Sequence, residues 1–159
     1  PVDLRVASDI ISRKWSCALF NKYYMRLIRN QAVALVEQFP SALNPLKNLK
    51  TIWDFDVNYT APAGGFKDVD DYYDRSSSKH FLEEIKTPTS ILSAKDDPFV
   101  PGYLFDQIAT NEKVTLHKPD NGGHMGYISR RVTPHGDRRW MDYAVLEWIR
   151  ELHESGGNP

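Results

Sequence analysis

Apolar residues in the first quarter of the chain recur at the spacing of an α-helix. Between about residues 8 and 39, Trp15, Leu19, Tyr23 and Leu27 stand four positions apart, which places them along one face of a helix. Basic residues cover the rest of this helix: Arg13, Lys14, Lys22, Arg26 and Arg29. We expect the apolar face to pack on a core, with a lid or partner-binding helix as the alternative.

Two shorter helical patterns and an irregular segment fill the chain as far as residue 80. Residues 46–55 and 68–78 have helical spacing, and between them residues 54–66 contain glycines, prolines and several aromatic side chains. No strand pattern occurs before residue 78. Helices joined by such a loop are typical of a cap over a ligand site, so we predict a helical cap or lid region over residues 1–80.

Strands and helices alternate in the second half of the chain. The expected elements are a strand at 85–94, a helix at 103–109, a strand at 114–117 and a helix at 138–152. Asp137 is placed to cap the last helix. This order predicts a βαβα unit over residues 81–154 with parallel strands and a right-handed crossover.

A parallel sheet of two strands is too small to be stable alone, because parallel strands need both faces covered. The fold class predicted is therefore α/β, and we expect the chain to be the C-terminal part of a larger doubly wound protein. Residues 155–159, Ser-Gly-Gly-Asn-Pro, predict a disordered tail.

Composition narrows the function only by exclusion. The chain of 159 residues carries 20 basic and 21 acidic residues, a formal charge of −1, which gives no electrostatic footprint for nucleic acid or for an anionic membrane. Its single cysteine, Cys17, excludes an internal disulfide and a Cys-rich zinc site and is expected to be a packed thiol. No apolar run reaches the roughly 20 residues of a membrane span. We expect a cytoplasmic protein, with membrane association of any preceding segment left open.

Candidate chemistry follows the two predicted strands. SAKDDPFVP (residues 93–101) puts Asp96 and Asp97 after the first, and Gly-Gly-His124-Met-Gly follows the second. Groups beyond the carboxyl ends of parallel strands share one edge of the sheet, so an acid there is placed to orient His124 as a general base. Taken alone, each motif is more often a pair of capping acids or a loop histidine. Together, in this order, they favour a catalytic pair.

These segments resemble those of a known family. SAKDDPFVP followed by DNGGHMGYISRR resembles the last two catalytic segments of α/β-hydrolases, whose chain order is serine, acid, histidine. Together with NYTAPAGGFKDVDDYYDRSSS they look like the YheT-like branch, which includes hydrolases of the ABHD1/ABHD3 type. The resemblance implies a helical cap plus the last two parallel strands and helices of the α/β-hydrolase fold. It also implies hydrolysis of a carboxylic ester through a serine acyl-enzyme.

Site residues are carried over from the resemblance one by one. The family's acid falls on Asp97 and its histidine on His124. Asp96 is expected to serve a turn or a helix cap. Four residues match the cap segment and are implied to line an acyl pocket: Phe55, Thr60, Pro62 and Phe66. The resemblance implies a small-molecule or lipid-like ester as substrate and no metal or organic cofactor, and the charge balance predicts no nucleic-acid partner.

The sequence departs from the family at the nucleophile. It contains no Gly-x-Ser-x-Gly motif and no oxyanion-hole segment, and we expect both upstream of Pro1. The chain by itself should then be catalytically inactive. A different class of interpretation is a non-catalytic interaction module that uses the apolar helix face, and exposed strand edges predict self-association. The acids Asp70, Asp71 and Asp74 with His80 are interpreted as a solvated surface and not as a metal site.

Overall fold

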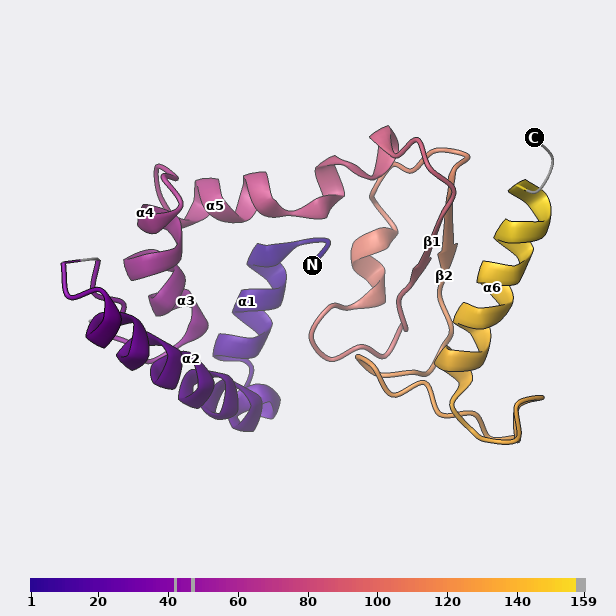
Figure 1. The fold of residues 1–159 in the computed structure, drawn as a ribbon, viewed down its shortest axis with the longest axis horizontal. Helices are drawn as coiled ribbons and strands as arrows, with labels where there is room; N and C mark the ends of the chain where they lie inside the picture. Colours follow the sequence, from indigo (N-terminus) through magenta and orange to yellow (C-terminus); the bar gives the residue numbers. More distant parts are fainter. Residues whose placement is uncertain (42, 47, 157–159) are drawn as a thin grey trace. The chain divides into compact units, whose positions relative to one another are not determined.

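Figure 1 shows the fold of the protein, a computed structural model that describes residues 1–41, 43–46 and 48–156. The chain divides into two compact units, Pro1–His80 and a second that begins at Phe81. The first is built of helices, and the second contains a pair of strands and the long helix α6. The predicted class, helices with two parallel strands, is confirmed.

The first predicted helix is two helices. α1 spans Leu4–Arg13, capped by the Asp3 carboxylate, and α2 spans Ala18–Gln38. Between them Lys14 has extended backbone and Trp15–Cys17 form a single 3₁₀ turn. The expectation of one helix over 8–39 is therefore wrong. No glycine or proline marks the break, and the apolar repeat continues across it, so only packing, with Cys17 buried as expected, reveals the bend.

The apolar face of α2 is exposed, contrary to the expectation that it packs on a core. On α2 the exposed fractions are 81% for Leu19, 59% for Tyr23 and 41% for Leu27, and Trp15, in the 3₁₀ turn before the helix, is 89% exposed. The helix instead buries small and flexible residues, with Met25 and Ala32 fully inside. Because α2 also has apolar residues on the opposite side of the helix, Met25 and Ala32 among them, the repeat could not tell which apolar face is inside.

Short helices complete the first unit. α3 is Ile52–Phe55, with a reciprocal cap between Thr51 and Asp54, and α5 is Val69–Ser76, capped by Asp68. The helix expected over 46–55 is thus limited to its last four residues, and Lys47 lies outside the described residues. The remaining turns are a π turn at Asp56–Thr60, α4 at Ala61–Ala63, and 3₁₀ turns at Ser78–His80 and, in the second unit, Leu82–Glu84.

The core of the first unit surrounds Tyr73. Its buried members are Ala61, Val69 and Tyr73, against which Trp53 and Phe66 pack. The Tyr73 hydroxyl donates to Asp56 Oδ2 (2.7 Å). Burial of both groups raises the pKa of the Asp56 carboxyl and of the Tyr73 phenol. An aromatic ring and a satisfied polar pair therefore occupy the centre of one small core.

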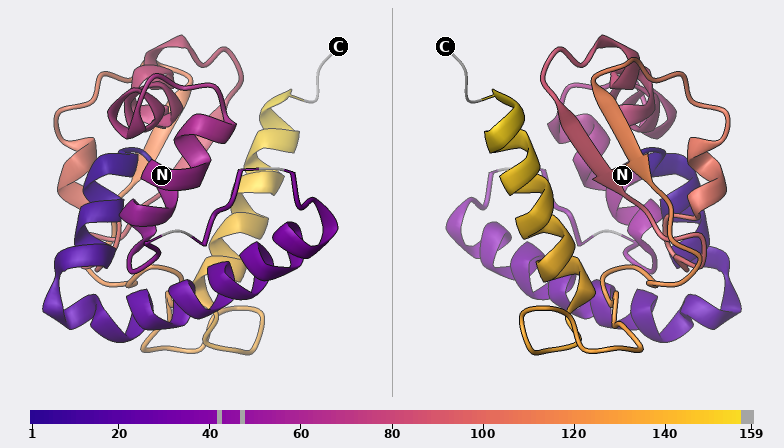
Figure 2. Two further views of the ribbon diagram at one scale, coloured as in Figure 1. Left: turned by 90° about the vertical axis from the view of Figure 1, so that its left-hand side faces the viewer. Right: turned by 90° about the vertical axis from the view of Figure 1, so that its right-hand side faces the viewer.

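The second unit contains the parallel strand pair. β1, Thr89–Leu92, pairs with β2, Val114–His117, from Thr89 opposite Val114 to Leu92 opposite His117. Figure 2 shows the two strands side by side and pointing the same way. The helix expected over 103–109 is wrong, since only a 3₁₀ turn at Gly102–Phe105 forms.

Helix α6 packs beside this pair and spans Trp140–Gly156. The His117 ring stacks on Trp148 with 3.9 Å between centroids, which joins the end of β2 to the helix. Asp137 lies ahead of the helix, where its carboxylate accepts from the Arg139 amide (2.9 Å). The helix includes the first two residues of the expected disordered tail, and residues 157–159 lie outside the described residues.

Candidate active site

Backbone hydrogen bonds join the loop that follows β1 to the loop that follows β2. Backbone pairing continues beyond the sheet, as the Ser93 amide donates to the His117 carbonyl (3.0 Å) and the Lys95 amide to the Pro119 carbonyl (2.9 Å). This brings residues 93–100 beside residues 118–127. The two motifs singled out in the sequence therefore lie at one edge of the sheet, as parallel strand order requires.

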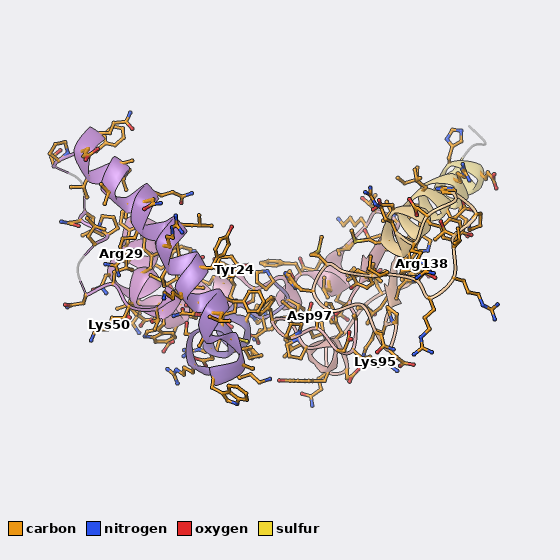
Figure 3. The ribbon with its side chains drawn as sticks, turned by 90° about the horizontal axis from the view of Figure 1, so that it is seen from below. Tyr24, Arg29, Lys50, Lys95, Asp97 and Arg138 are labelled. Carbon is orange, nitrogen blue, oxygen red and sulfur yellow. The ribbon has the colours of Figure 1, made fainter. Side chains whose placement is uncertain are left out.

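Asp97 is a fixed and nearly buried carboxylate. Its Oδ1 atom accepts from the amides of Phe99 (2.8 Å) and Val100 (2.9 Å), while Oδ2 lies 2.9 Å from His124 Nδ1. The side chain of Asp97 is 6% exposed and that of His124 is 43% exposed. Figure 3 labels Asp97 in the second unit. Because both oxygens of Asp97 have partners, the carboxylate cannot rotate without losing hydrogen bonds.

The contact with Asp97 selects one form of the His124 ring. An ionised carboxylate can only accept, so the proton lies on Nδ1 and the lone pair on Nε2. The ring also meets Phe99 edge to face, with centroids 5.2 Å apart and planes at 81°. An imidazole held in this way is suited to take a proton from a hydroxyl at Nε2, with the carboxylate stabilising the cation that forms.

Asp96 has a different role from the turn or helix cap expected for it. Its Oδ1 atom accepts from the amides of Gly122 (2.9 Å) and Gly123 (2.8 Å), in the loop that carries His124. The two adjacent acids therefore have separate partners. Asp97 contacts the ring of His124, and Asp96 accepts hydrogen bonds from the backbone of the loop that carries His124. In the sequence, the two glycines directly before His124 are the feature from which this contact could have been predicted.

Glycine is required at both positions of this anchor, for different reasons. A Cβ atom on Gly122 would lie 2.4 Å from the ring of Tyr127, and Gly123 has a φ of +57°. Tyr127, which the sequence analysis did not single out, also accepts from the Ala94 amide through its hydroxyl (3.1 Å). Burial raises the pKa of Tyr127, so its hydroxyl stays protonated. The two loops are therefore connected at Ala94, Asp96 and Asp97.

Removing the Asp96 anchor should loosen the histidine loop. In Asp96→Ala, we expect hydrogen exchange at the amides of Gly122 and Gly123 to become about fivefold faster, because each loses a hydrogen bond of net ~1 kcal/mol. The control is Asp120→Ala, which removes an acid of the same loop that pairs with the side chain of Lys95. Equal acceleration in both variants, measured by NMR, would argue against the anchor.

The four residues implied to line an acyl pocket lie in the first unit, where their contacts are internal. The Thr60 hydroxyl donates to Asp56 Oδ1 (2.7 Å), and Phe55 packs on Tyr59. Phe66 packs on Tyr72 at 5.2 Å, whereas Pro62 is exposed. Their role in binding substrate stays a prediction.

Acidic residues elsewhere are used in ion pairs. Asp70 pairs with Arg5, Asp71 with Arg75 and Asp74 with His80. Within the described ranges, no group of three or more His, Cys, Asp or Glu side chains is arranged to hold a metal ion. In the same part of the chain, no serine, threonine or cysteine side chain hydrogen-bonds to His124. The described residues therefore bring a carboxylate and an imidazole into contact at this edge of the sheet.

Curated proteins of known name match most of the chain. It is 33% identical to the monoacylglycerol lipase of Saccharomyces cerevisiae over 147 residues, covering 90% of this chain and 32% of the lipase. It is 27% identical to YheT of Escherichia coli over 142 residues, covering 86% and 41% of the two chains. It is 26% identical to phospholipase ABHD3 of Mus musculus over 159 residues, covering 94% and 37%.

The chain spans between about a third and two fifths of the length of these relatives. No protein-family profile matches it, and no solved structure does. The relatives are esterases and lipases of one type, and they match both the helical unit and the unit that carries Asp97 and His124. The chain therefore belongs to the α/β-hydrolase superfamily, in the YheT-like branch that its motifs resemble.

Proposed function

We propose that the chain supplies the acid and the histidine of a serine-type carboxylic ester hydrolase. The observation that carries the proposal is the contact of 2.9 Å between Asp97 Oδ2 and His124 Nδ1, with Asp97 Oδ1 held by two backbone amides. This arrangement leaves Nε2 of a half-exposed ring free to act as a base. A nearly buried carboxylate with three hydrogen-bond partners holds the ring in one orientation, as an orienting acid must.

The proposed reaction uses this pair twice. His124 Nε2 takes the proton of a serine hydroxyl while the serine oxygen attacks the ester carbonyl, and the Asp97 carboxylate stabilises the resulting imidazolium. The imidazolium then gives its proton to the departing alkoxide, which leaves an acyl-enzyme. Water, deprotonated by His124 in turn, attacks the acyl carbonyl, and the proton returns to the serine as the acid is released.

The nucleophile and the oxyanion hole are proposed to lie in a part of the protein outside this sequence. Two observations support this: the sequence has no Gly-x-Ser-x-Gly motif, and its relatives are two to three times as long. A superfold alone does not fix the reaction. The names of the relatives, a monoacylglycerol lipase and a phospholipase, support an ester with an apolar acyl chain as substrate.

Labelling with a fluorophosphonate probe tests the proposal. The full-length hydrolase should label at a serine, and His124→Ala should abolish labelling, because the serine is then not deprotonated. The present chain alone should neither label nor hydrolyse p-nitrophenyl esters. A full-length protein that fails to label would favour the non-catalytic interaction module. Turnover by the chain alone would contradict the proposal that the nucleophile lies outside this sequence.

A further inference from the structure

A groove lined by cationic side chains runs along α2 in the first unit. Lys22, Arg26 and Arg29 follow one another at four and three positions, so they lie on one stripe of the helix. Lys50 joins them from the turn before α3, and the buried Met25 also lines this space of about 540 Å³. Figure 3 shows Arg29 and Lys50 near each other on one side of α2.

The charge of this groove is not neutralised within the protein. Across the described ranges, no carboxylate forms an ion pair with any of the four cations. Arg29 donates to the carbonyl of Leu49 (2.7 Å), which holds the turn carrying Lys50 against the helix. Helix α2 contains three basic residues, Lys22, Arg26 and Arg29, and one acidic residue, Glu37, which lies more than two turns beyond Arg29. The first part of the helix therefore carries an excess of positive charge in a chain whose formal charge is −1.

Exposed apolar side chains lie next to the cations. Leu19 and Tyr23 each stand three positions before a cation, Lys22 and Arg26, so helical geometry makes them neighbours. Leu27 lies on the same stripe of α2, one turn beyond Tyr23, and Trp15 is exposed in the 3₁₀ turn that precedes the helix. A helix with aromatic and aliphatic residues on one side and Lys and Arg on its flank has the composition of one that lies in a membrane interface. No described helix is long and apolar enough to cross a membrane, and lying in the interface does not require one.

We propose that this surface, defined by Lys22, Arg26, Arg29 and Lys50 with Trp15, Leu19, Tyr23 and Leu27, binds the face of an anionic lipid bilayer. The apolar side chains enter the boundary between headgroups and acyl chains, and the four cations contact lipid phosphates. Charge complementarity favours this occupant, because a symmetric contact with a second copy of the chain would place the same uncompensated cations against each other. The proposal is independent of the ester hydrolase function, since none of its residues belongs to the Asp97–His124 site.

Co-sedimentation with vesicles tests the proposal. The full-length protein should bind vesicles of phosphatidylcholine with phosphatidylglycerol and bind vesicles of phosphatidylcholine alone much more weakly, and raising the salt concentration should reduce binding. The variant Lys22→Gln/Arg26→Gln should bind the anionic vesicles about 25-fold more weakly, at about fivefold for each charge removed. The matched control, Arg130→Gln/Arg131→Gln, removes the same charge from exposed residues of the second unit and should change binding less than twofold.

A second variant distinguishes binding to a bilayer from binding to a soluble phosphate ligand or to a second copy of the chain. Leu19→Ser/Tyr23→Ser keeps every cation but removes apolar contact, and it should also lose binding to anionic vesicles, with an unchanged circular dichroism spectrum. Retained binding in this variant, together with displacement by inorganic phosphate, would overturn the proposal in favour of a soluble phosphate ligand. Absence of vesicle binding, with a dimer in analytical ultracentrifugation that Leu19→Ser/Tyr23→Ser dissociates, would overturn it in favour of a second copy.

Discussion

Replacing Asp97 with asparagine should lower the esterase kcat of the full-length hydrolase by about 10⁴-fold, with little change in KM. The Oδ1 atom of asparagine can still accept from the amides of Phe99 and Val100, so the loop keeps its shape. Its NH₂ group, however, faces His124 Nδ1 and can only donate, which forces the ring proton onto Nε2. The base is then blocked at the atom that must accept the serine proton. Steady-state kinetics with a p-nitrophenyl ester measures the effect.

The adjacent acid provides the control for this prediction. Asp96→Asn should reduce kcat far less, because Asp96 contacts backbone amides of Gly122 and Gly123 and does not contact the ring. A merely structural role for Asp97 would instead lower the melting temperature and leave the pH profile of kcat/KM unaltered. A loss of less than tenfold in Asp97→Asn would contradict the assignment of this residue as the orienting acid.

Truncating Tyr73 should have the largest effect on stability. The side chain is 1% exposed, packs against Trp53 and donates to the buried Asp56 carboxylate. Tyr73→Ala removes a buried aromatic ring and should lower the free energy of unfolding of the first unit by about 4 kcal/mol. Tyr72→Ala, at the half-buried neighbouring position, is the control and should cost clearly less. Urea unfolding followed by tryptophan fluorescence measures both, and equal losses would contradict the central place of Tyr73 in the core.

The hydroxyl of Tyr73 has a contribution that depends on pH. Tyr73→Phe keeps the ring and removes the donor to Asp56, which should cost about 1–3 kcal/mol at neutral pH. Burial raises the pKa of Asp56, and the hydrogen bonds from Tyr73 and Thr60 oppose that rise. The carboxyl therefore stabilises the fold most below its unfolded pKa, and that stability is lost as pH rises through the raised folded value. The loss of unfolding free energy in Tyr73→Phe should be smallest at acidic pH and should grow as the Asp56 carboxyl ionises. A loss that does not depend on pH would contradict this role of the hydroxyl.

Local sequence patterns were enough to predict several elements and the contact between Asp97 and His124. The second strand was predicted with its observed bounds, 114–117, and the first was predicted within a few residues, because short β-branched and apolar runs beside Pro88 have few alternatives. The acid after one strand and the histidine after the next are in contact because parallel strands direct both loops to one edge. Such rules depend on neighbours along the chain and on strand order, both of which the sequence contains.

Other features were decided only by the tertiary structure. The break between α1 and α2 at Lys14 has no glycine or proline to mark it, and the inner face of α2 is chosen by what the rest of the unit offers to Met25 and Ala32. The separate partners of Asp96 and Asp97 depend on the register between two loops, which a motif does not specify. The cationic groove arises where Lys50 folds back beside Lys22 and Arg26, although the total charge is nearly zero. Composition gives the number of residues of each kind, and periodicity gives their spacing along the chain. The direction in which each side chain points is set by contacts between residues that are far apart in the sequence.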